Sequence, residues 1–192
     1  DGWQMRDNSP IQPESSCVII DPYTGNVVAL VGGRGQKTIN LGLNYATQTK
    51  RPPGSSLKPV SVYGPALEKG LITYGSVLDD APINFGTEKI DPETGKKTYS
   101  NSHGYPKNSP DRYRGLSTIN EGIRVSINTV AWRTLSLLGP ENSYEFLTEK
   151  VGISTLVNNH VGAGGAVFTD VAFAPLALGQ LTYGVTVKEL TA

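Results

Sequence analysis

The order of the apolar segments constrains the fold of this chain most strongly. Two β-branched segments, residues 15–21 and 27–31, flank a Pro/Gly/Asn-containing turn and predict a β-hairpin. After a Thr-x-x-Glu capping box at residues 118–121, apolar residues recur at helical spacing until Gly139, and a further helix is predicted at 141–150. Because strands come first and helices follow, without βαβ alternation, the pattern predicts an α+β fold rather than a doubly wound sheet.

The two predicted strands are almost continuously apolar. The hairpin is therefore expected to be covered on at least one face. Cys17, the one cysteine of the chain, lies in the first strand, and we interpret it as a buried strand residue.

A helix is predicted over residues 55–68, where Pro52-Pro53-Gly54 introduces it and Gly70 ends it. Residues 71–113 follow, rich in Gly, Pro, Asn and Asp and without a clear element. A segment of this length is expected to be functional or partly mobile.

Length and charge restrict the class of protein. A chain of 192 residues suits one domain with a buried core. The formal net charge is +0, so the sequence offers no basic stripe for nucleic acid or an anionic membrane surface. No apolar run approaches the ~20 residues that span a bilayer. Residues 1–14 are polar and proline-containing and are expected to be a linker or incoming arm, and residues 15–192 the domain.

Ser55 and Lys58 form a Ser-x-x-Lys tetrapeptide at the start of the predicted helix. Positions i and i+3 share a helix face, so the Lys58 amine can reach the Ser55 hydroxyl. A serine hydroxyl becomes a strong nucleophile when a base takes its proton, and a lysine is such a base where its pKa is lowered. Backbone N–H groups at the helix start suit a developing oxyanion. The alternative is a serine N-cap followed by a solvated lysine, since about one such tetrapeptide is expected by chance.

Ser126-Ile127-Asn128 lies between two predicted helical stretches, where a short turn would present Ser126 and Asn128 to a cleft. The alternative is a serine N-cap with an incidental asparagine. Each pattern is weak alone. Together, and in this order, they match the pairing of a Ser-x-x-Lys element with a Ser-x-Asn element that serine acyl-transfer enzymes use.

The surroundings of both motifs resemble the transpeptidase domain of class A, bifunctional penicillin-binding proteins. The similarity extends over about residues 16–192. It is carried by Asp21-Pro22-Tyr23-Thr24-Gly25, Val31-Gly32-Gly33, Arg51-Pro52-Pro53-Gly54-Ser55-Ser56-Leu57-Lys58-Pro59, Ala66-Leu67-Glu68-Lys69-Gly70, the Thr-Asp-Val-Ala-Phe-Ala-Pro-Leu-Ala-Leu-Gly segment at 169–179, and Tyr183-Gly184-Val185-Thr186.

The resemblance implies the penicillin-binding/β-lactamase-like fold, an antiparallel sheet flanked by helices, here incomplete at the C-terminus. It also implies a DD-transpeptidase that cross-links peptidoglycan. Ser55 would attack the carbonyl between two D-alanines of a stem peptide, and Lys58 would accept its proton. Ser126 would relay that proton to the departing D-alanine, and Asn128 would bond the substrate amide and help hold Lys58.

The same resemblance implies the partners and the location. Stem peptides would be the substrates and β-lactams covalent inhibitors, with no metal or organic cofactor. The enzyme would act on the extracytoplasmic face of the bacterial membrane, where an upstream anchor holds it. Class A members also carry an upstream glycosyltransferase domain.

The third family motif, Lys-Thr/Ser-Gly, is absent from these residues. Lys37-Thr38-Ile39 and Lys97-Thr98-Tyr99 lack the glycine and precede the second motif. A Thr186–Glu189 capping box predicts a helix that begins shortly before Ala192. We therefore interpret the sequence as a piece of a longer protein, and expect it alone to acylate slowly or not at all and to self-associate.

Two alternatives stay open. A DD-carboxypeptidase or serine β-lactamase on the same fold differs in whether water or an amine resolves the acyl-enzyme. A non-catalytic scaffolding or binding module is the second alternative. Among the other polar residues, His103 and His160 lie far apart, which makes a metal site unexpected. Asp79 and Asp80 are interpreted as solvated loop carboxylates.

Overall fold

The computed structural model describes residues 13–36, 39–83, 88–95, 97–99 and 105–192. The helices are α1 (Gly64–Glu68), α2 (Ile119–Arg124), α3 (Asn128–Leu138), α4 (Pro140–Glu145), α5 (Phe173–Leu178) and α6 (Val187–Thr191). The antiparallel strand pairs are β1 (Cys17–Ile20) with β2 (Val27–Val31), β3 (Val77–Asp80) with β6 (Gly115–Thr118), β4 (Glu88–Ile90) with β5 (Lys97–Tyr99), and β7 (His160–Val161) with β8 (Val167–Phe168).

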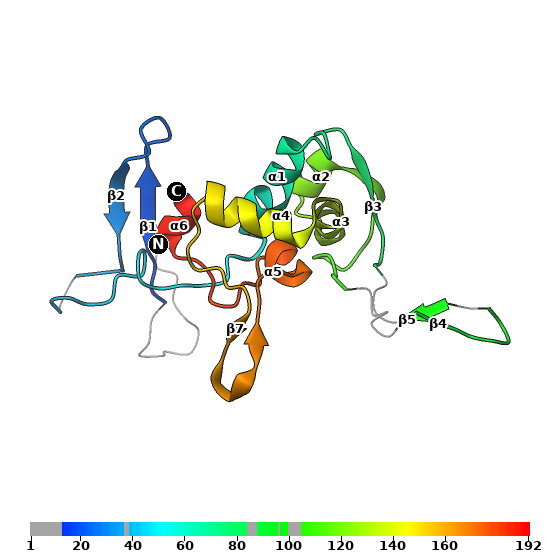
Figure 1. The fold of residues 1–192 in the computed structure, drawn as a ribbon. Coiled ribbons are helices and arrows are strands. Elements are labelled where there is room, and N and C mark those ends of the chain that lie inside the picture. The colour runs from blue at the N-terminus through cyan, green and yellow to red at the C-terminus, as the bar shows by residue number, and fades with distance from the viewer. Residues whose placement is uncertain (1–12, 37–38, 84–87, 96, 100–104) are drawn as a thin grey trace.

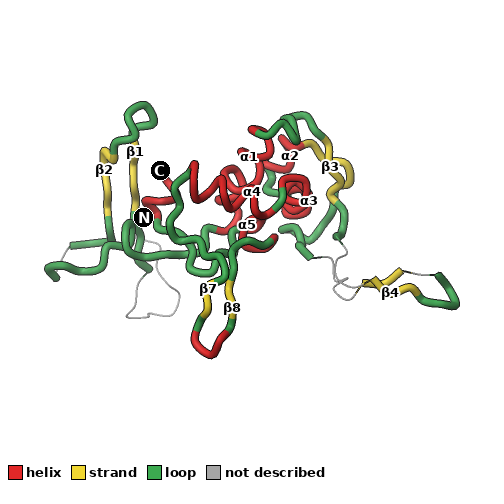
Figure 2. Tube along the Cα trace, viewed as in Figure 1, coloured by secondary structure: helices red, strands yellow, loops and turns green. Residues whose placement is uncertain are grey.

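Helices form the centre of the molecule, and the strand pairs lie around them (Figure 2). The β1–β2 hairpin lies on one side, with α6 next to β1, and β3 lies on the opposite side beyond α3 (Figure 1). No helix among the described residues is long and apolar enough to cross a membrane. The mixture of helices and antiparallel strands confirms the predicted α+β class.

Helix α3 is the centre of the hydrophobic core. The residues predicted on its apolar face are all buried, namely Ile127, Val130, Ala131, Leu135 and Leu138. This helix packs against α1 and α5, whose buried residues complete the core. Gly139 ends α3 with a φ of +84°, as predicted. The predicted helix at 141–150 appears as α4, continued by the π-helical turn η3 (Phe146–Lys150).

Both predicted capping boxes mark helix starts. The Thr118 Oγ1 accepts a hydrogen bond from the Glu121 N–H at 3.1 Å, at the start of α2. At α6 the interaction is reciprocal, because Thr186 Oγ1 accepts from the Glu189 N–H at 3.1 Å and Glu189 Oε2 accepts from the Thr186 N–H at 3.0 Å. These local signals predicted the start of each helix correctly.

The N-terminal hairpin forms as predicted, but its burial differs from the expectation. β1 pairs antiparallel with β2, and α6 packs against β1. Within β1 only Val18 is buried, and every residue of β2 is exposed. The expectation that Cys17 is buried is wrong, because alternate strand residues face opposite sides and Cys17 faces away from the side on which Val18 lies.

Residues 71–113 contain strands that local patterns did not reveal. β3 pairs with β6 across this segment, with Val77 opposite Thr118 and Asp80 opposite Gly115. The β3 sequence Val-Leu-Asp-Asp reads as a loop because half of its residues are carboxylates. The strand forms through pairing with a segment more than thirty positions away, which no local pattern encodes.

Candidate active site

The helix that carries Ser55 and Lys58 is wound in three ways. A 3₁₀ turn η1 (Gly54–Leu57) leads into the π-helical turn η2 (Pro59–Tyr63) and then into α1. The structure confirms that residues 55–68 are helical, but it does not show a uniform α-helix. Pro59 lacks a backbone N–H and cannot continue an α-helical hydrogen-bond ladder, so the winding changes there. In a 3₁₀ turn, residues i and i+3 lie on one side, which places Ser55 and Lys58 on the same side.

Ser55 and Lys58 differ in their surroundings. Ser55 is exposed, and among the described residues its hydroxyl has no hydrogen-bond partner. Leu57, which lies between Ser55 and Lys58 in the sequence, is fully buried and anchors the turn in the core. Lys58 itself is only 2% exposed. The turn therefore presents a free hydroxyl to solvent and directs an amine into the protein.

The Lys58 amine brings three of the four predicted site residues together. Its Nζ donates to the Ser126 backbone oxygen at 3.0 Å, the Ser126 Oγ at 3.1 Å and the Asn128 Oδ1 at 2.5 Å. Among the described residues the Ser55 hydroxyl is not hydrogen-bonded to the Lys58 amine, although the Lys58 backbone N–H donates to the Ser55 backbone oxygen. The two motifs, distant in sequence, thus meet at the lysine.

Burial lowers the pKa of Lys58 from its ordinary value of 10.5 to about 8. The cause is desolvation, which disfavours the charged ammonium. The acceptors around Nζ are neutral oxygens rather than carboxylates, so they offset only part of that cost. With a pKa of about 8, roughly one Lys58 in ten is neutral at pH 7.

Ser126 has a left-handed backbone, with a φ of +58°. It follows α2 in a Schellman turn, in which the Ile127 N–H donates to the Gly122 oxygen at 2.9 Å. Glycine is the usual residue at this position, and a serine there costs about 1–2 kcal/mol. Ser126 thus combines a strained backbone with a hydroxyl that contacts a buried amine, which makes it a candidate functional residue.

The side chain of Asn128 is held from two directions. Its Nδ2 donates to the Lys107 backbone oxygen at 2.6 Å, while its Oδ1 accepts from Lys58. This arrangement fixes which way the amide points, since Nδ2 must face the carbonyl. Sequence analysis could not predict this role of Lys107, because a backbone oxygen has no residue-type signal.

The segment before Ser55 packs against Gly179 and Gly184, two glycines to which sequence analysis assigned no structural role. Gly54 N–H donates to the Gly179 oxygen at 3.2 Å, and Arg51 forms an antiparallel bridge with Val185. A Cβ at Gly179 would lie 2.0 Å from the Gly54 oxygen, and one at Gly184 would lie 2.1 Å from the Arg51 carbonyl carbon. The two backbones approach so closely that only glycine fits at either position. Glycines just after an apolar helical run were the available signal.

Gly179→Ala is expected to slow any chemistry at Ser55 by roughly 10²-fold, because an ångström-scale displacement of a reacting group has that cost. Gly70→Ala is the matched control, since Gly70 has a similar φ of +68° but no atom within 4 Å of an added Cβ. Both variants bear the backbone strain of about 1–2 kcal/mol, and only Gly179→Ala displaces the Ser55 segment. Acylation rates measured on both variants check this, and equal rates would contradict it.

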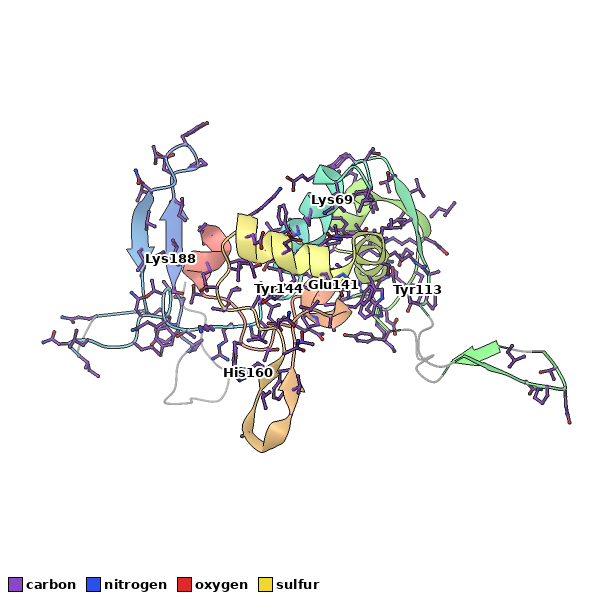
Figure 3. The ribbon with its side chains drawn as sticks, in the orientation of Figure 1. Lys69, Tyr113, Glu141, Tyr144, His160 and Lys188 are labelled. Carbon is purple, nitrogen blue, oxygen red and sulfur yellow. The ribbon has the colours of Figure 1, made fainter. Side chains whose placement is uncertain are left out.

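The remaining predicted polar residues have other surroundings. His160 lies in the β7–β8 hairpin, far from Lys69 at the end of α1 (Figure 3), and its Nε2 is 2.8 Å from the Tyr183 hydroxyl. His103 lies outside the described residues. Asp79 is exposed, as expected. The interpretation of Asp80 as a solvated carboxylate is wrong: Asp80 is 1% exposed, because the β3–β6 pairing places it against α3.

Comparison with known proteins identifies the family of this chain. The sequence model of the penicillin binding protein transpeptidase domain matches residues 15–187. The chain is 38% identical over 172 residues to penicillin-binding protein 1A of Clostridium tetani, covering 90% of this chain and 19% of that protein. The crystal structure of penicillin-binding protein 1A from Haemophilus influenzae superposes with a TM-score of 0.58 at 34% identity, covering 82% of this chain and 22% of that one. Pseudomonas aeruginosa PBP2, 19% identical, shares the fold with a TM-score of 0.65, covering 92% of this chain and 44% of that one.

The chain belongs to the penicillin-binding protein transpeptidase domain family. Relatives at 33–38% identity include penicillin-binding proteins 1A, which confirms the resemblance to class A members. The chain spans about a fifth of the length of these curated relatives.

Proposed function

We propose that this chain carries the acylation centre of a peptidoglycan DD-transpeptidase, with Ser55 as nucleophile and Lys58 as its base. The observation that supports it is the buried Lys58 amine, whose pKa of about 8 suits a base, one turn from the exposed Ser55. A base is most effective when its pKa lies close to the working pH. Family membership supports the same reaction class.

In the acylation step, the Ser55 Oγ attacks the carbonyl carbon between two D-alanines of a stem peptide, and neutral Lys58 takes the hydroxyl proton. A neutral amine keeps two N–H donors and gains one lone pair. Those donors can stay on the Ser126 backbone oxygen and Asn128 Oδ1, which leaves the lone pair free to accept the proton. The step requires the Ser55 hydroxyl to lie within hydrogen-bond distance of Nζ when the substrate is bound.

Ser126 then returns the proton to the leaving group. Protonated Lys58 donates to the Ser126 Oγ, which lies 3.1 Å away, and the Ser126 hydroxyl donates to the nitrogen of the departing D-alanine. The C–N bond breaks and an ester on Ser55 remains. An amine of a neighbouring stem peptide attacks that ester, forms the cross-link and restores the Ser55 hydroxyl.

Asn128 has two tasks in this proposal. Its Oδ1 holds Lys58, and one N–H of its Nδ2 is committed to the Lys107 oxygen. The second N–H of that amide remains for a carbonyl of the substrate. A β-lactam would imitate the D-alanyl-D-alanine end, open its ring on Ser55 and persist as the ester. These steps call for no metal or organic cofactor.

We place the activity in the natural polypeptide that contains this chain, because the chain spans only about a fifth of the length of its curated relatives. Residues 15–192 would form the N-terminal part of the transpeptidase domain, with residues 1–14 as its incoming arm. The enzyme would act on the extracytoplasmic face of the bacterial membrane, held there by an upstream anchor.

The test follows the fate of the acyl group. The natural polypeptide is incubated with a stem peptide ending in D-alanyl-D-alanine and an acceptor amine, and products are identified by mass spectrometry. D-alanine release with a cross-linked product is expected. Release with hydrolysed peptide alone would indicate a carboxypeptidase, and catalytic turnover of penicillin a β-lactamase. If the polypeptide neither releases D-alanine nor forms a penicillin adduct, it is a binding module, and the proposal is overturned.

The rate of acylation by penicillin is expected to rise about tenfold between pH 7 and pH 9 and then level off. The lowered pKa of Lys58, about 8, is the reason, because the neutral base forms as pH rises through that value. Stopped-flow measurement across this range checks the prediction. A rate that still climbs steeply above pH 9 would mean that Lys58 keeps its ordinary pKa, and a flat profile would mean that no such base takes part.

A further inference from the structure

A buried carboxylate lies behind the site. Asp80, at the end of β3, accepts hydrogen bonds from Asn108 Nδ2 at 2.6 Å, from Thr129 Oγ1 at 2.5 Å and from the Arg114 backbone N–H at 2.9 Å. All three donors are neutral groups. A buried charge satisfied in this way is costly to move, so it fixes the groups that donate to it.

Asn108 connects Asp80 to the start of α3. Because Asn108 Nδ2 must face the Asp80 carboxylate, its Oδ1 points toward α3 and accepts from the Asn128 N–H at 2.9 Å. The N-cap position of α3, Ile127, has no side chain that can cap the helix. Asn108 therefore supplies, from a distant loop, the acceptor that an N-cap residue ordinarily provides.

The same loop holds the side chain of Asn128. The Lys107 oxygen accepts from Asn128 Nδ2 at 2.6 Å, next to the contact between Asn108 and the Asn128 backbone. Figure 3 shows this side of the molecule, marked by the label of Tyr113. Tyr113 comes shortly before β6 in the sequence and lies close to β3 and α3. Residues 107 and 108 thus hold Asn128 by both its backbone and its side-chain amide. The oxygen of that amide accepts a hydrogen bond from Lys58.

We infer that Asp80 and Asn108 are positioning residues that orient Asn128, and through Asn128 the base Lys58. The inference rests on the proposed function, because it concerns the rate at which Ser55 is acylated. Asp80, together with the Arg112 backbone oxygen that also accepts from Asn108 Nδ2 at 3.1 Å, sets the direction of the Asn108 amide. Asn108 with Lys107 sets the position of Asn128. Displacement of Asn128 then leaves Lys58 without its shortest hydrogen bond.

The first test exchanges donor and acceptor. Introduced alone, Asp80→Asn or Asn108→Asp removes the hydrogen-bonded pair of one carboxylate and one amide. Each single variant is expected to slow acylation by penicillin by roughly 10-fold or more. The double variant Asp80→Asn/Asn108→Asp again pairs one amide with one carboxylate. It is expected to acylate faster than either single variant but below the parental rate, because a carboxylate at position 108 cannot donate to the Arg112 oxygen. Should one single variant be too unstable to purify, the double variant is compared with the other. An exchanged pair that folds but acylates no faster than the slower single variant would overturn the inference.

The second test asks whether Asn108 acts through Asn128. In the Asn128→Ala background, Asn108→Asp is expected to change the acylation rate by less than about twofold, because coupled residues are not additive. If Asn108→Asp acted through a general loss of structure, its effect on the acylation rate would multiply with the effect of Asn128→Ala. That result would contradict the inference. Thr134→Val is the matched control: it removes a buried hydroxyl of α3 that bonds only within the helix, and the parental rate is expected.

Failure of the inference and failure of the proposed function give different results. If the parental polypeptide is not acylated, the proposed function is wrong. If the parent is acylated and both single variants match its rate, Asp80 and Asn108 have no positioning role.

Discussion

Ser55→Ala is expected to abolish covalent labelling of the natural polypeptide by a fluorescent penicillin. The hydroxyl of Ser55 is exposed and unpartnered among the described residues, so its removal breaks no contact in the fold. The loss of labelling would therefore come from the missing nucleophile rather than from unfolding, and the melting temperature should remain within about 1 °C of the parental value. Gel fluorescence and thermal unfolding measure the two quantities.

Ser56→Ala is the matched control for Ser55→Ala. Ser56 is also exposed, and its Oγ donates to the Pro53 oxygen at 2.7 Å. Its removal alters the same turn without removing the proposed nucleophile. Labelling that survives in Ser55→Ala, or that disappears in Ser56→Ala as well, would contradict the assignment.

Lys58→Ala is expected to lower the acylation rate by roughly 10²-fold or more, the usual contribution of a general base. Lys58→Arg should be about as slow, because a guanidinium is not deprotonated in proteins and cannot take the Ser55 proton. The arginine variant separates the two ways in which a lysine could act. If Lys58 served only as a positive charge, Lys58→Arg would keep most of the rate.

The stability of Lys58→Ala is expected to stay close to that of the parent. The substitution removes hydrogen bonds to Ser126 and Asn128, and it also removes the cost of a desolvated amine. Lys69→Ala, which changes an exposed lysine at the end of the same helix, is the control for rate and melting temperature. Acylation of Lys58→Ala at near the parental rate would make Lys58 a structural residue.

Local patterns predicted the elements that local interactions form. Thr118 and Thr186 cap helices because a short polar side chain followed three residues later by glutamate satisfies the first N–H groups. The apolar face of α3 follows from its periodicity. Ser55 and Lys58 could be paired from their spacing alone, because 3₁₀ and α-helical winding both place residues i and i+3 on similar sides.

The features that sequence analysis missed depend on contacts between distant segments. Asp80 is buried because β6 and the loop at Asn108 close over it, and the partners lie 28 and 34 positions away along the chain. Gly179 contributes through its close approach to Gly54. The exposure of Cys17 depends on which face of the hairpin the rest of the chain covers. In each case the residue type alone fits several environments, and only the packing selects one.

The most direct test of this account is the location of the penicillin adduct. The natural polypeptide is acylated with benzylpenicillin at pH 8, digested, and sequenced by tandem mass spectrometry. A single adduct on the Ser55 hydroxyl is expected, formed in the parent and absent from Ser55→Ala. An adduct on Ser56, on Ser126 or on Lys58 itself would contradict the central claim that Ser55 is the nucleophile and Lys58 its base.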